Sequence, residues 1–298
     1  QKAYQQATIA VYFFAPAPYN QGLLYDHNIK FKKVTAGKIR RYFSILNFFD
    51  LFKTAWGVIG ALLDVFDIYP DVVFSKGGFG SFPTVLAARI LRIPVFIHES
   101  DSVPGKANKW AGKFATRVGI SYKEAFPFFK EDRTIHTGQP ILEERLTPIT
   151  NSATEFFGFN QTIPTLFIMG GSQGAEFINN AILDILPDLV KSFQIIHQTG
   201  QANIEIMKES AAAILLENQH RARYKPFAYL NGLEMRMAAG VANLIISRAG
   251  STIFEIASWG KPAIIIPITN SNGNHQVKNA FTYAKIGACS VIQEENLK

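Results

Sequence analysis

Three polar segments in the second half of the sequence each follow an apolar run and open a helical pattern, which is where ligands of parallel α/β sheets bind. The first, Met169–Ala175, contains Gly171, Ser172 and Gln173. Its glycines allow a sharp turn, and the free amides and dipole at the start of the next helix favour a phosphate. The segment is neither the G-x-G-x-x-G dinucleotide fingerprint nor a P-loop, because the P-loop lysine is absent. It is either a diphosphate site or a tight turn without a ligand.

The second segment ends at Glu255 and contains Ser247, Arg248, Gly250, Ser251 and Thr252. Either Ser251 or Thr252 could cap the following helix. Glu255 would then lie about one turn inside that helix, where its carboxylate could accept hydrogen bonds from both hydroxyls of a ribose, as in other nucleotide-binding folds. The alternative is a capping or surface glutamate without a ligand.

The third segment covers residues 274–279 and contributes His275, Gln276 and Asn279. It follows the apolar run Ala263–Ile266 and a loop rich in asparagine and glycine. Side chains of this kind can hydrogen-bond the hydroxyls of a sugar. An ordinary helix N-terminus has a similar composition, so both interpretations stay open.

Two loops in the first half also follow apolar runs. The loop Lys76–Pro83 supplies Gly77, Gly78 and Ser81, and the loop after Ile97 supplies His98, Glu99 and Asp101. The glycines suit a phosphate here too, and His98 or Asp101 could accept a proton. A histidine at the end of a strand is more often structural than catalytic, so the base is left unassigned.

The stretch before residue 70 combines basic and aromatic residues. No acidic residue lies between Asp26 and Asp50, and the cations there are Lys30, Lys32, Lys33, Lys38, Arg40 and Arg41. The helical pattern that follows has two apolar stripes, one of Phe49, Phe52, Trp56, Ile59 and Leu63 and one of Phe48, Leu51, Val58 and Leu62. One stripe can pack on a sheet, and the other leaves apolar surface that nearby cations direct toward an anionic membrane. The alternative is a helix buried on nearly all sides.

The elements that would hold these residues alternate regularly. The expected strands are Thr8–Phe14, Ile29–Val34, Asp71–Ser75, Pro94–His98, Arg117–Ser121, Thr165–Met169, Phe193–His197, Arg221–Phe227, Asn243–Ile246 and Ala263–Ile266. Continuous apolar strands that alternate with helices predict parallel sheets covered on both faces. The rhythm breaks in the proline-containing segment 141–163, which we interpret as a linker between domain 1–140 and domain 164–298. The fold class is therefore α/β, with two Rossmann-like doubly wound parallel-sheet domains facing a cleft.

Composition agrees with this class. The 298 residues are 48% hydrophobic and carry a net charge of +7, which suits a globular protein with nucleic acid, an anionic membrane or a phosphorylated substrate as a partner. The single cysteine, Cys289, rules out an intramolecular disulfide and fits a reducing compartment. No apolar run approaches the roughly 20 residues that span a bilayer, and no signal peptide is visible.

In their order and spacing these motifs resemble the MurG family of glycosyltransferases, which have the two-domain GT-B fold. The most specific parts are Lys76–Pro83, Ile97–Gly105 with Asn108–Trp110, Thr137–Pro140, Gly170–Ala175 and Ser247–Glu255. The resemblance implies transfer of N-acetylglucosamine, with inversion, from UDP-N-acetylglucosamine to lipid I, undecaprenyl-diphospho-N-acetylmuramoyl-pentapeptide. The product would be lipid II, the precursor of peptidoglycan. The protein would lie peripherally on the cytoplasmic face of the bacterial plasma membrane, with no nucleic-acid partner, and no D-x-D pair suggests a metal or other cofactor.

The resemblance also implies roles by position. The second domain would hold the donor, with Ser172 at the diphosphate, Glu255 at the ribose and Phe227 or a neighbour at the uracil. Further donor contacts would come from Gly171, Gln173, Arg248, Gly250, Ser251, Thr252, His275, Gln276 and Asn279, the last three at the sugar. The first domain would hold the acceptor through Gly77, Gly78, Ser81, His98, Glu99 and Asp101. The membrane-associating patch would comprise Arg40, Arg41, Phe48, Phe52, Trp56 and Trp110.

The chain departs from the family pattern in several places. It begins after the family's first glycine-rich, histidine-bearing loop, and its last residue precedes the family's terminal helical segment. We therefore expect a chain truncated at both ends, with weak binding or no activity. Gln139 and Leu142 stand where the family often has Asn and Arg, and the HEQN-like loop reads His98–Asp101. The rival interpretations are another GT-B enzyme, such as a UDP-sugar epimerase or a glycolipid synthase, and a nucleotide-sugar-binding module without catalysis.

Overall fold

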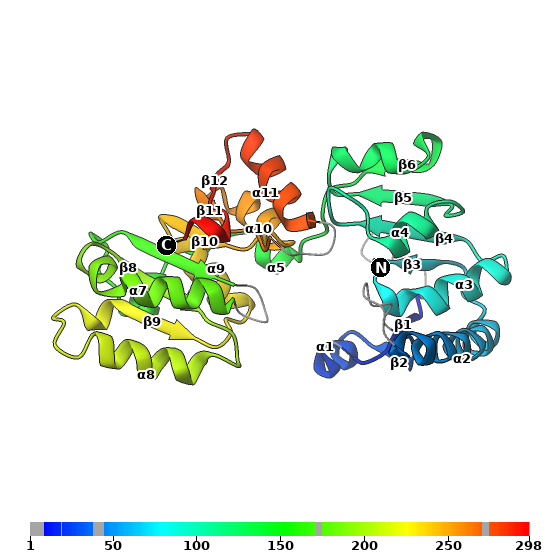
Figure 1. The fold of residues 1–298 in the computed structure, drawn as a ribbon, viewed down its shortest axis with the longest axis horizontal. Helices are drawn as coiled ribbons and strands as arrows, with labels where there is room; N and C mark the ends of the chain where they lie inside the picture. Colours follow the sequence, from blue (N-terminus) through cyan, green and yellow to red (C-terminus); the bar gives the residue numbers. More distant parts are fainter. Residues whose placement is uncertain (1–8, 19, 38–44, 171–174, 270–273, 298) are drawn as a thin grey trace. The chain divides into compact units, whose positions relative to one another are not determined.

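Alternating strands and helices build two units, residues 1–138 and 139–298, in the computed structural model of the chain (Figure 1). The structure describes residues 9–18, 20–37, 45–170, 175–269 and 274–297, without the side chains of residues 45–49 and 51. The strands within each unit pair in parallel, and the buried hydrophobic clusters lie within single units.

The first unit contains two parallel sheets. Strand β1 (Val11–Ala15) pairs with β2 (Ile29–Lys33), and a four-stranded sheet follows in the order β3 (Val73–Ser75), β4 (Val95–Glu99), β5 (Arg117–Ile120) and β6 (Thr134–His136). The helices are α1 (Gln21–Asp26), α2 (Ile45–Ile68), α3 (Phe82–Ile90) and α4 (Lys106–Ala111), with 3-10 turns at Phe79–Ser81, Lys123–Phe128 and Glu131–Arg133. The apolar pattern did not predict α1 and β6, because α1 buries no residue and only the first of three residues in β6 is buried.

Helices α2 and α3 lie side by side in the first unit (Figure 1). Ala61 and Val65 of α2 are buried in the same cluster as Val85 and Ala88 of α3. The opposite side of α2 is exposed along its described length. The exposed face carries the first predicted stripe, from Phe52 to Leu63, whereas the packed face centres on Ala61 and Val65, which lie outside both predicted stripes, with Leu62 of the second stripe only partly buried.

The second unit is a single six-stranded parallel sheet. Its order is β12 (Cys289–Val291), β11 (Ala263–Ile265), β10 (Leu244–Ser247), β7 (Thr165–Met169), β8 (Gln194–Gln198) and β9 (Tyr224–Phe227). The helices are α7 (Glu176–Ser192), α8 (Ile204–Ile214), α9 (Gly232–Val241), α10 (Thr252–Trp259) and α11 (His275–Lys285), with 3-10 turns at Arg221–Arg223 and Glu294–Asn296. The segment expected as a linker contains two short helices, α5 (Glu143–Leu146) and α6 (Ala153–Phe157), both in contact with α9.

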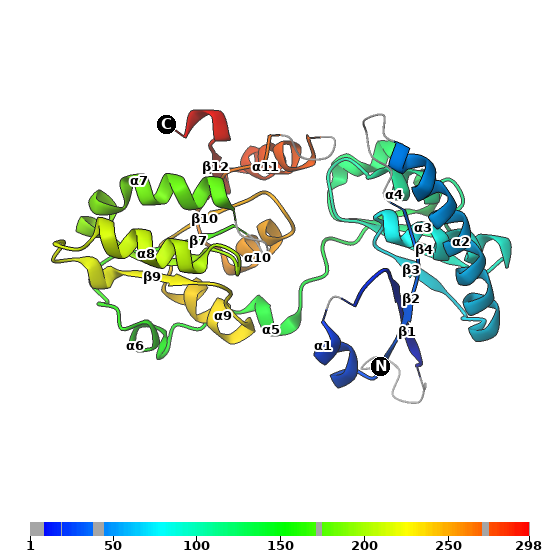
Figure 2. The same cartoon turned by 60° about the horizontal axis from the view of Figure 1, so that its bottom comes forward.

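Alternate residues of β7 point into two different cores. Leu166 and Ile168 belong to the cluster that contains buried residues of α7 and α8. Phe167 and Met169 belong to the cluster that contains buried residues of α9, α10 and α11. Because successive side chains of a strand point to opposite faces, the sheet is covered by helices on both sides (Figure 2). This confirms the predicted doubly wound α/β fold.

The strand order creates a switch point between β7 and β10. These two strands are adjacent and parallel, with Met169 paired to Ser247 at their carboxyl ends. From β7 the chain proceeds through α7 to β8 on one side, and from β10 through α10 to β11 on the other. Connections that diverge in this way leave a crevice at the carboxyl edge, which is the usual ligand site of an open α/β sheet.

Candidate functional site

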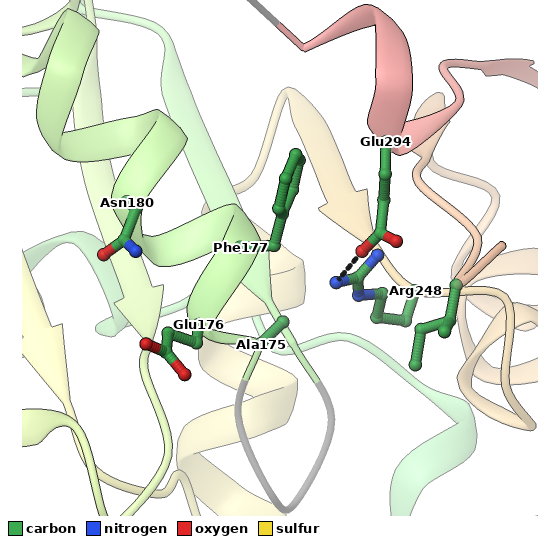
Figure 3. A pocket seen from close by; sticks show the side chains of 7 residues that line it. Ala175, Glu176, Phe177, Asn180, Arg248 and Glu294 are labelled. Atoms are coloured by element: carbon green, nitrogen blue, oxygen red, sulfur yellow. Dashed lines mark ion pairs between the residues drawn. The ribbon is translucent and has the colours of Figure 1, made fainter. Parts of the chain in front are cut away.

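A pocket of about 480 Å³ lies at this switch point (Figure 3). It is lined by Ala175, Glu176, Phe177 and Asn180 at the start of α7 and by Arg248, Ile268 and Glu294. Gly171, Ser172 and Gln173 lie outside the described residues, but in sequence they join β7 to this wall of the pocket. The α7 residues that face the pocket were not singled out from the sequence, although their place in the first two turns after a glycine-rich loop was a usable signal.

Arg248 lines the pocket with its charge already paired. Its Nη2 lies 2.5 Å from Oε1 of Glu294, and its Nη1 donates to the carbonyl of Ile266 at 3.1 Å. The two side chains of the pair are only 10% and 18% exposed. Arg248 therefore joins the β10 and β11 loops to the last turn of the chain, a contact that its sequence neighbourhood did not predict.

Glu255 lies in the first turn of α10 and has an arginine partner. Nη1 of Arg145 donates to Oε1 of Glu255 at 3.1 Å, and the two side chains are 26% and 17% exposed. Burial lowers the pKa of Arg145, but the hydrogen bond and charge of Glu255 outweigh it and leave that pKa above its usual value. Arg145 comes from α5, inside the segment taken as a linker, so sequence reasoning missed it.

The other residues predicted to contact the donor near α10 differ in their burial and in their hydrogen bonds. Ser251 stands at the N-cap of α10 but makes no capping hydrogen bond through its side chain. Gly250 has open space where a Cβ would stand, so the loop can approach a ligand closely there. Thr252 opens the helix and is half-buried. Phe227 packs against the core, with its ring centroid 5.8 Å from that of Phe157.

The predicted sugar-binding residues all lie on α11 but serve different contacts. Gln276 accepts a hydrogen bond from the Ile268 amide at 3.1 Å through Oε1. Asn279 is 2% exposed, and its Nδ2 lies 3.4 Å from the carbonyl of Ala249. It therefore supports the loop after β10 from inside. His275 is the first residue of the helix.

In the first unit, His98 is held at both ring nitrogens. Nε2 faces the carbonyl of Gly138 at 2.9 Å, and Nδ1 faces the Lys76 ammonium at 2.8 Å. A carbonyl only accepts, so Nε2 carries the hydrogen and Nδ1 accepts from Lys76. Burial, together with the Lys76 charge, lowers the pKa of His98 despite the favourable carbonyl. Because both ring nitrogens are engaged, the imidazole is held in one orientation, which suits a positioning role better than that of a base.

Glu99 is a buried carboxylate surrounded by donors. It is 4% exposed and accepts from the amides of Asp101 and Gly105 and, at 2.9 Å, from Nδ2 of Asn108. Burial raises the pKa of Glu99, and these donors work in the opposite direction. The carboxylate thus fixes the loop that the sequence marked for the acceptor, and Asp101 follows on the same half-buried loop.

Gly77 and Gly78 both have φ of +84°, which favours glycine. A Cβ on Gly77 would stand 2.7 Å from Oδ1 of Asn108, whereas Gly78 has open space. Lys76 just before them also donates to Oγ of Ser100 at 2.7 Å, and Ser81 donates to the carbonyl of Gly78 at 2.9 Å. The two loops after β3 and β4 therefore form one hydrogen-bonded cluster, as expected for loops at one edge of a parallel sheet.

Comparison with known proteins agrees with this architecture. The model of the glycosyltransferase family 28 N-terminal domain matches residues 2–120, and that of the C-terminal domain matches residues 165–298. The chain is 36% identical over 277 residues to the UDP-N-acetylglucosamine--N-acetylmuramyl-(pentapeptide) pyrophosphoryl-undecaprenol N-acetylglucosamine transferase 2 of Bacillus cereus strain ATCC 10987, covering 92% of this chain and 76% of that protein. This chain belongs to the MurG family of glycosyltransferases.

Three further similarities agree with this result, two with MurG-type proteins and one with a protein that shares only the fold. The chain is 38% identical over 278 residues to the like-named transferase of Clostridium novyi, covering 92% of this chain and 75% of that protein. The crystal structure of Acinetobacter baumannii MurG matches with a TM-score of 0.69 at 27% identity, over 100% of this chain and 80% of that one. A UDP-GlcNAc 2-epimerase from Neisseria meningitidis bound to UDP-GlcNAc matches with a TM-score of 0.65 at 15% identity, over 99% and 83% of the two chains, which shows a shared fold alone.

The exposed face of α2 in this MurG-family chain carries several large apolar side chains. Phe52, Trp56, Leu63 and Phe66 are 60%, 74%, 66% and 65% exposed. Arg40, Arg41 and the side chain of Phe48 lie outside the described residues. Trp110, expected on the same patch, is instead half-buried, with its ring 4.8 Å from that of Phe82 and 4.9 Å from that of Phe114. In the part of the chain that the structure describes, no helix is long and apolar enough to cross a membrane.

Proposed function

We propose that this chain transfers N-acetylglucosamine from UDP-N-acetylglucosamine to lipid I and so forms lipid II in peptidoglycan synthesis, with inversion at the anomeric carbon. The observation that carries the proposal is the identity of 36% and 38% to transferases named for this reaction, over 92% of the chain. The matches extend over about three quarters of those proteins and include both domains, so they are not confined to a nucleotide-binding half.

The donor would bind in the second unit at the β7–β10 switch point. The N-termini of α7 and α10 would direct amides and helix dipoles at the diphosphate, with Ser172 adding a hydroxyl. The partly buried carboxylate of Glu255 would accept from the ribose hydroxyls, and residues of α11 would face the sugar. A pocket of about 480 Å³ between α7 and the β10 loop supports this placement, because it has the size of a small-molecule site.

The acceptor diphosphate would bind at the loops after β3 and β4. Lys76 supplies a cation there, next to two glycines whose backbone can approach a phosphate closely. Burial lowers the pKa of Lys76, with Glu99 and Asp101 opposing that effect. An acceptor phosphate beside the ammonium would favour its charged form further.

In the reaction the acceptor C4 hydroxyl attacks the anomeric carbon and loses its proton to a base, while the bond to UDP breaks and UDP leaves with the electron pair. The helix N-termini would stabilise the charge on the leaving diphosphate. The base is not assigned. Because both nitrogens of His98 are engaged, Asp101 is the better of the two candidates in the described part of the chain.

We also propose that the protein works as a peripheral protein at the cytoplasmic face of the plasma membrane. The exposed face of α2 would enter the interface between headgroups and acyl chains of an anionic bilayer. Lys53 is exposed on this helix, and Lys106 and Lys109 are exposed on α4 of the same unit. Each cation near such a surface contributes about 1 kcal/mol to binding.

The reaction is tested by supplying UDP-N-acetylglucosamine with a lipid I analogue and measuring UDP release. The chain is assayed as it stands and in parallel with the additional segments that its relatives carry. Release that requires the acceptor supports the proposal. Interconversion of sugars without acceptor would indicate an epimerase, release with a different lipid acceptor only would indicate a glycolipid synthase, and binding without turnover in both forms would indicate a non-catalytic module.

One variant locates the donor, and a chelator tests for a metal. Glu255→Ala is expected to weaken UDP binding about 10- to 100-fold, since paired hydrogen bonds to a charged group are lost; unchanged affinity would remove Glu255 from the site. Because we propose that amides and helix dipoles suffice for the diphosphate, activity should persist in EDTA. Activity that disappears and returns with Mg²⁺ would overturn that part.

Membrane association is tested by flotation with vesicles that contain anionic lipid. Replacing Phe52, Trp56 and Leu63 with serine should remove most of the bound protein, because these side chains are exposed and would no longer bury apolar area. Serine at the equally exposed Ile206 and Leu216 of the second unit is the matched control. Equal loss in both variants, or no loss in the first, would contradict the proposal.

A further inference from the structure

The ion pair between α5 and α10 connects two segments that are far apart in sequence. Arg145 and Glu255 are separated by 110 positions, with Nη1 and Oε1 3.1 Å apart. The backbone of α5 is fixed to the same helix, because Nε1 of Trp259 donates to the carbonyl of Arg145 at 2.7 Å. Arg145 is thus anchored to α10 at two points, one through its carbonyl and one through its guanidinium.

The geometry at Glu255 leaves hydrogen-bonding capacity on the carboxylate. A carboxylate has about four lone-pair sites on two oxygens. Within the part of the chain that the structure describes, the side-chain hydrogen bond to this carboxylate comes from Arg145 and goes to Oε1, which leaves Oε2 and one lone pair of Oε1 as acceptors for a ligand with two hydroxyls. The Glu255 side chain is 17% exposed. Burial to this extent makes an unpaired carboxylate unfavourable, so a cationic partner is needed. The exposed part is still accessible to a ligand from solvent.

We infer that Arg145 is a positioning residue for nucleotide recognition, which holds the carboxylate of Glu255 in the orientation that accepts the two ribose hydroxyls. This inference rests on the proposed donor site. It adds a residue from the interdomain segment to that site and gives it a defined task. Arg145 affects binding of the 2′ and 3′ hydroxyls by orienting Glu255. The affinity for the base and the diphosphate does not depend on Arg145.

The task predicts a specific loss of discrimination. Wild-type protein should bind UDP about 10- to 100-fold more tightly than 2′,3′-dideoxy-UDP, which lacks both hydroxyls, because two hydrogen bonds to a charged acceptor are missing. In Arg145→Met this ratio should fall to about threefold or less, with affinity for the dideoxy nucleotide nearly unchanged. Arg145→Lys should restore part of the ratio, because an ammonium can still donate to Oε1.

Arg236 provides a matched control. Its Nε donates to the carbonyl of Thr147 at 2.7 Å, so it anchors the same segment of chain without contacting Glu255. Arg236→Met should keep the wild-type ratio even if it lowers the melting temperature. A merely structural role for Arg145 would make the two variants behave alike.

The experiment is calorimetry of the full 298-residue chain with UDP and 2′,3′-dideoxy-UDP, for wild type, the three arginine variants and Glu255→Gln. Loss of the ratio in Glu255→Gln and Arg145→Met, but not in Arg236→Met, supports the inference. A wild-type ratio in Arg145→Met, while Glu255→Gln loses it, overturns the inference and leaves the donor site standing. Absence of discrimination in wild type, or its survival in Glu255→Gln, overturns both.

Discussion

Acid should destabilise the second unit through one histidine. His197 of β8 is fully buried between two partners, with Nδ1 2.9 Å from the Tyr224 hydroxyl and Nε2 3.1 Å from Oδ1 of Asn179. Asn179 donates through Nδ2 to the carbonyl of Thr199, so its Oδ1 must accept. Nε2 of the imidazole therefore carries the hydrogen, and Nδ1 of the neutral ring accepts from the hydroxyl.

The size of the effect follows from the pKa. Burial lowers the pKa of His197 from 6.5 to about 3. A depressed histidine contributes stability that is fully present above pH 6.5 and is lost as the pH falls toward 3, because the unfolded chain takes up the proton first. Each pH unit below the unfolded pKa costs about 1.4 kcal/mol, so the free energy of unfolding should fall by about 2 kcal/mol between pH 7.5 and pH 5.0.

The assay is hydrogen exchange of the β8 and α7 amides in increasing urea at the two pH values, corrected for intrinsic exchange rates. His197→Gln keeps a donor and an acceptor but cannot titrate, so its free energy of opening should lose about 2 kcal/mol less than wild type over the same interval. A variant that is less stable than wild type at both pH values does not disturb the test, because only the change in the free energy of opening between pH 7.5 and pH 5.0 is compared. His220→Gln, at a partly exposed histidine before β9, is the control and should follow wild type. Parallel behaviour of His197→Gln and wild type would refute the reasoning.

Two further predictions concern loops of the two sites. Gly77→Ala should cost the first unit about 1–3 kcal/mol and slow transfer more than Gly78→Ala does, because both have φ of +84° but only the first Cβ would stand 2.7 Å from Oδ1 of Asn108. Melting curves and kcat/KM for the acceptor check this, and equal effects would show that the contact with Asn108 is unimportant. Arg248→Met should destabilise the second unit by about 3 kcal/mol, since it leaves the partly buried carboxylate of Glu294 unpaired. A double-mutant cycle with Glu294→Gln measures the coupling, and additive effects would argue against the pair.

The sequence was sufficient for features with a local physical signature. Apolar runs of strand length between amphipathic helices fixed the α/β class, because burial on both faces of a parallel sheet requires that pattern. A glycine-rich turn after a strand marked the loop around Gly77, where the φ of +84° favours glycine over other residues. Glu255 could be located within one helical turn of its loop for the same local reason.

Short or exposed elements escaped this signature. α1 buries no residue, and β6 has three residues of which one is buried, so neither contributes a readable hydrophobic period. The helices α5 and α6 were hidden in a segment rich in prolines and polar residues. Short elements of this kind depend on contacts with segments that are distant in the sequence. A short stretch of sequence therefore does not predict them.

Tertiary structure alone decided which polar groups meet. The partner of Glu255 comes from 110 positions away, and the pairs Arg248–Glu294 and Lys76–His98 also join segments that are separate in the sequence. The order of strands decided that β7 and β10 are neighbours and hence that their two loops share one pocket. Hydrogen bonds and ion pairs depend on distances of a few ångströms between groups whose proximity only the folded chain creates, whereas periodicity and turn chemistry act between residues that are already adjacent along it.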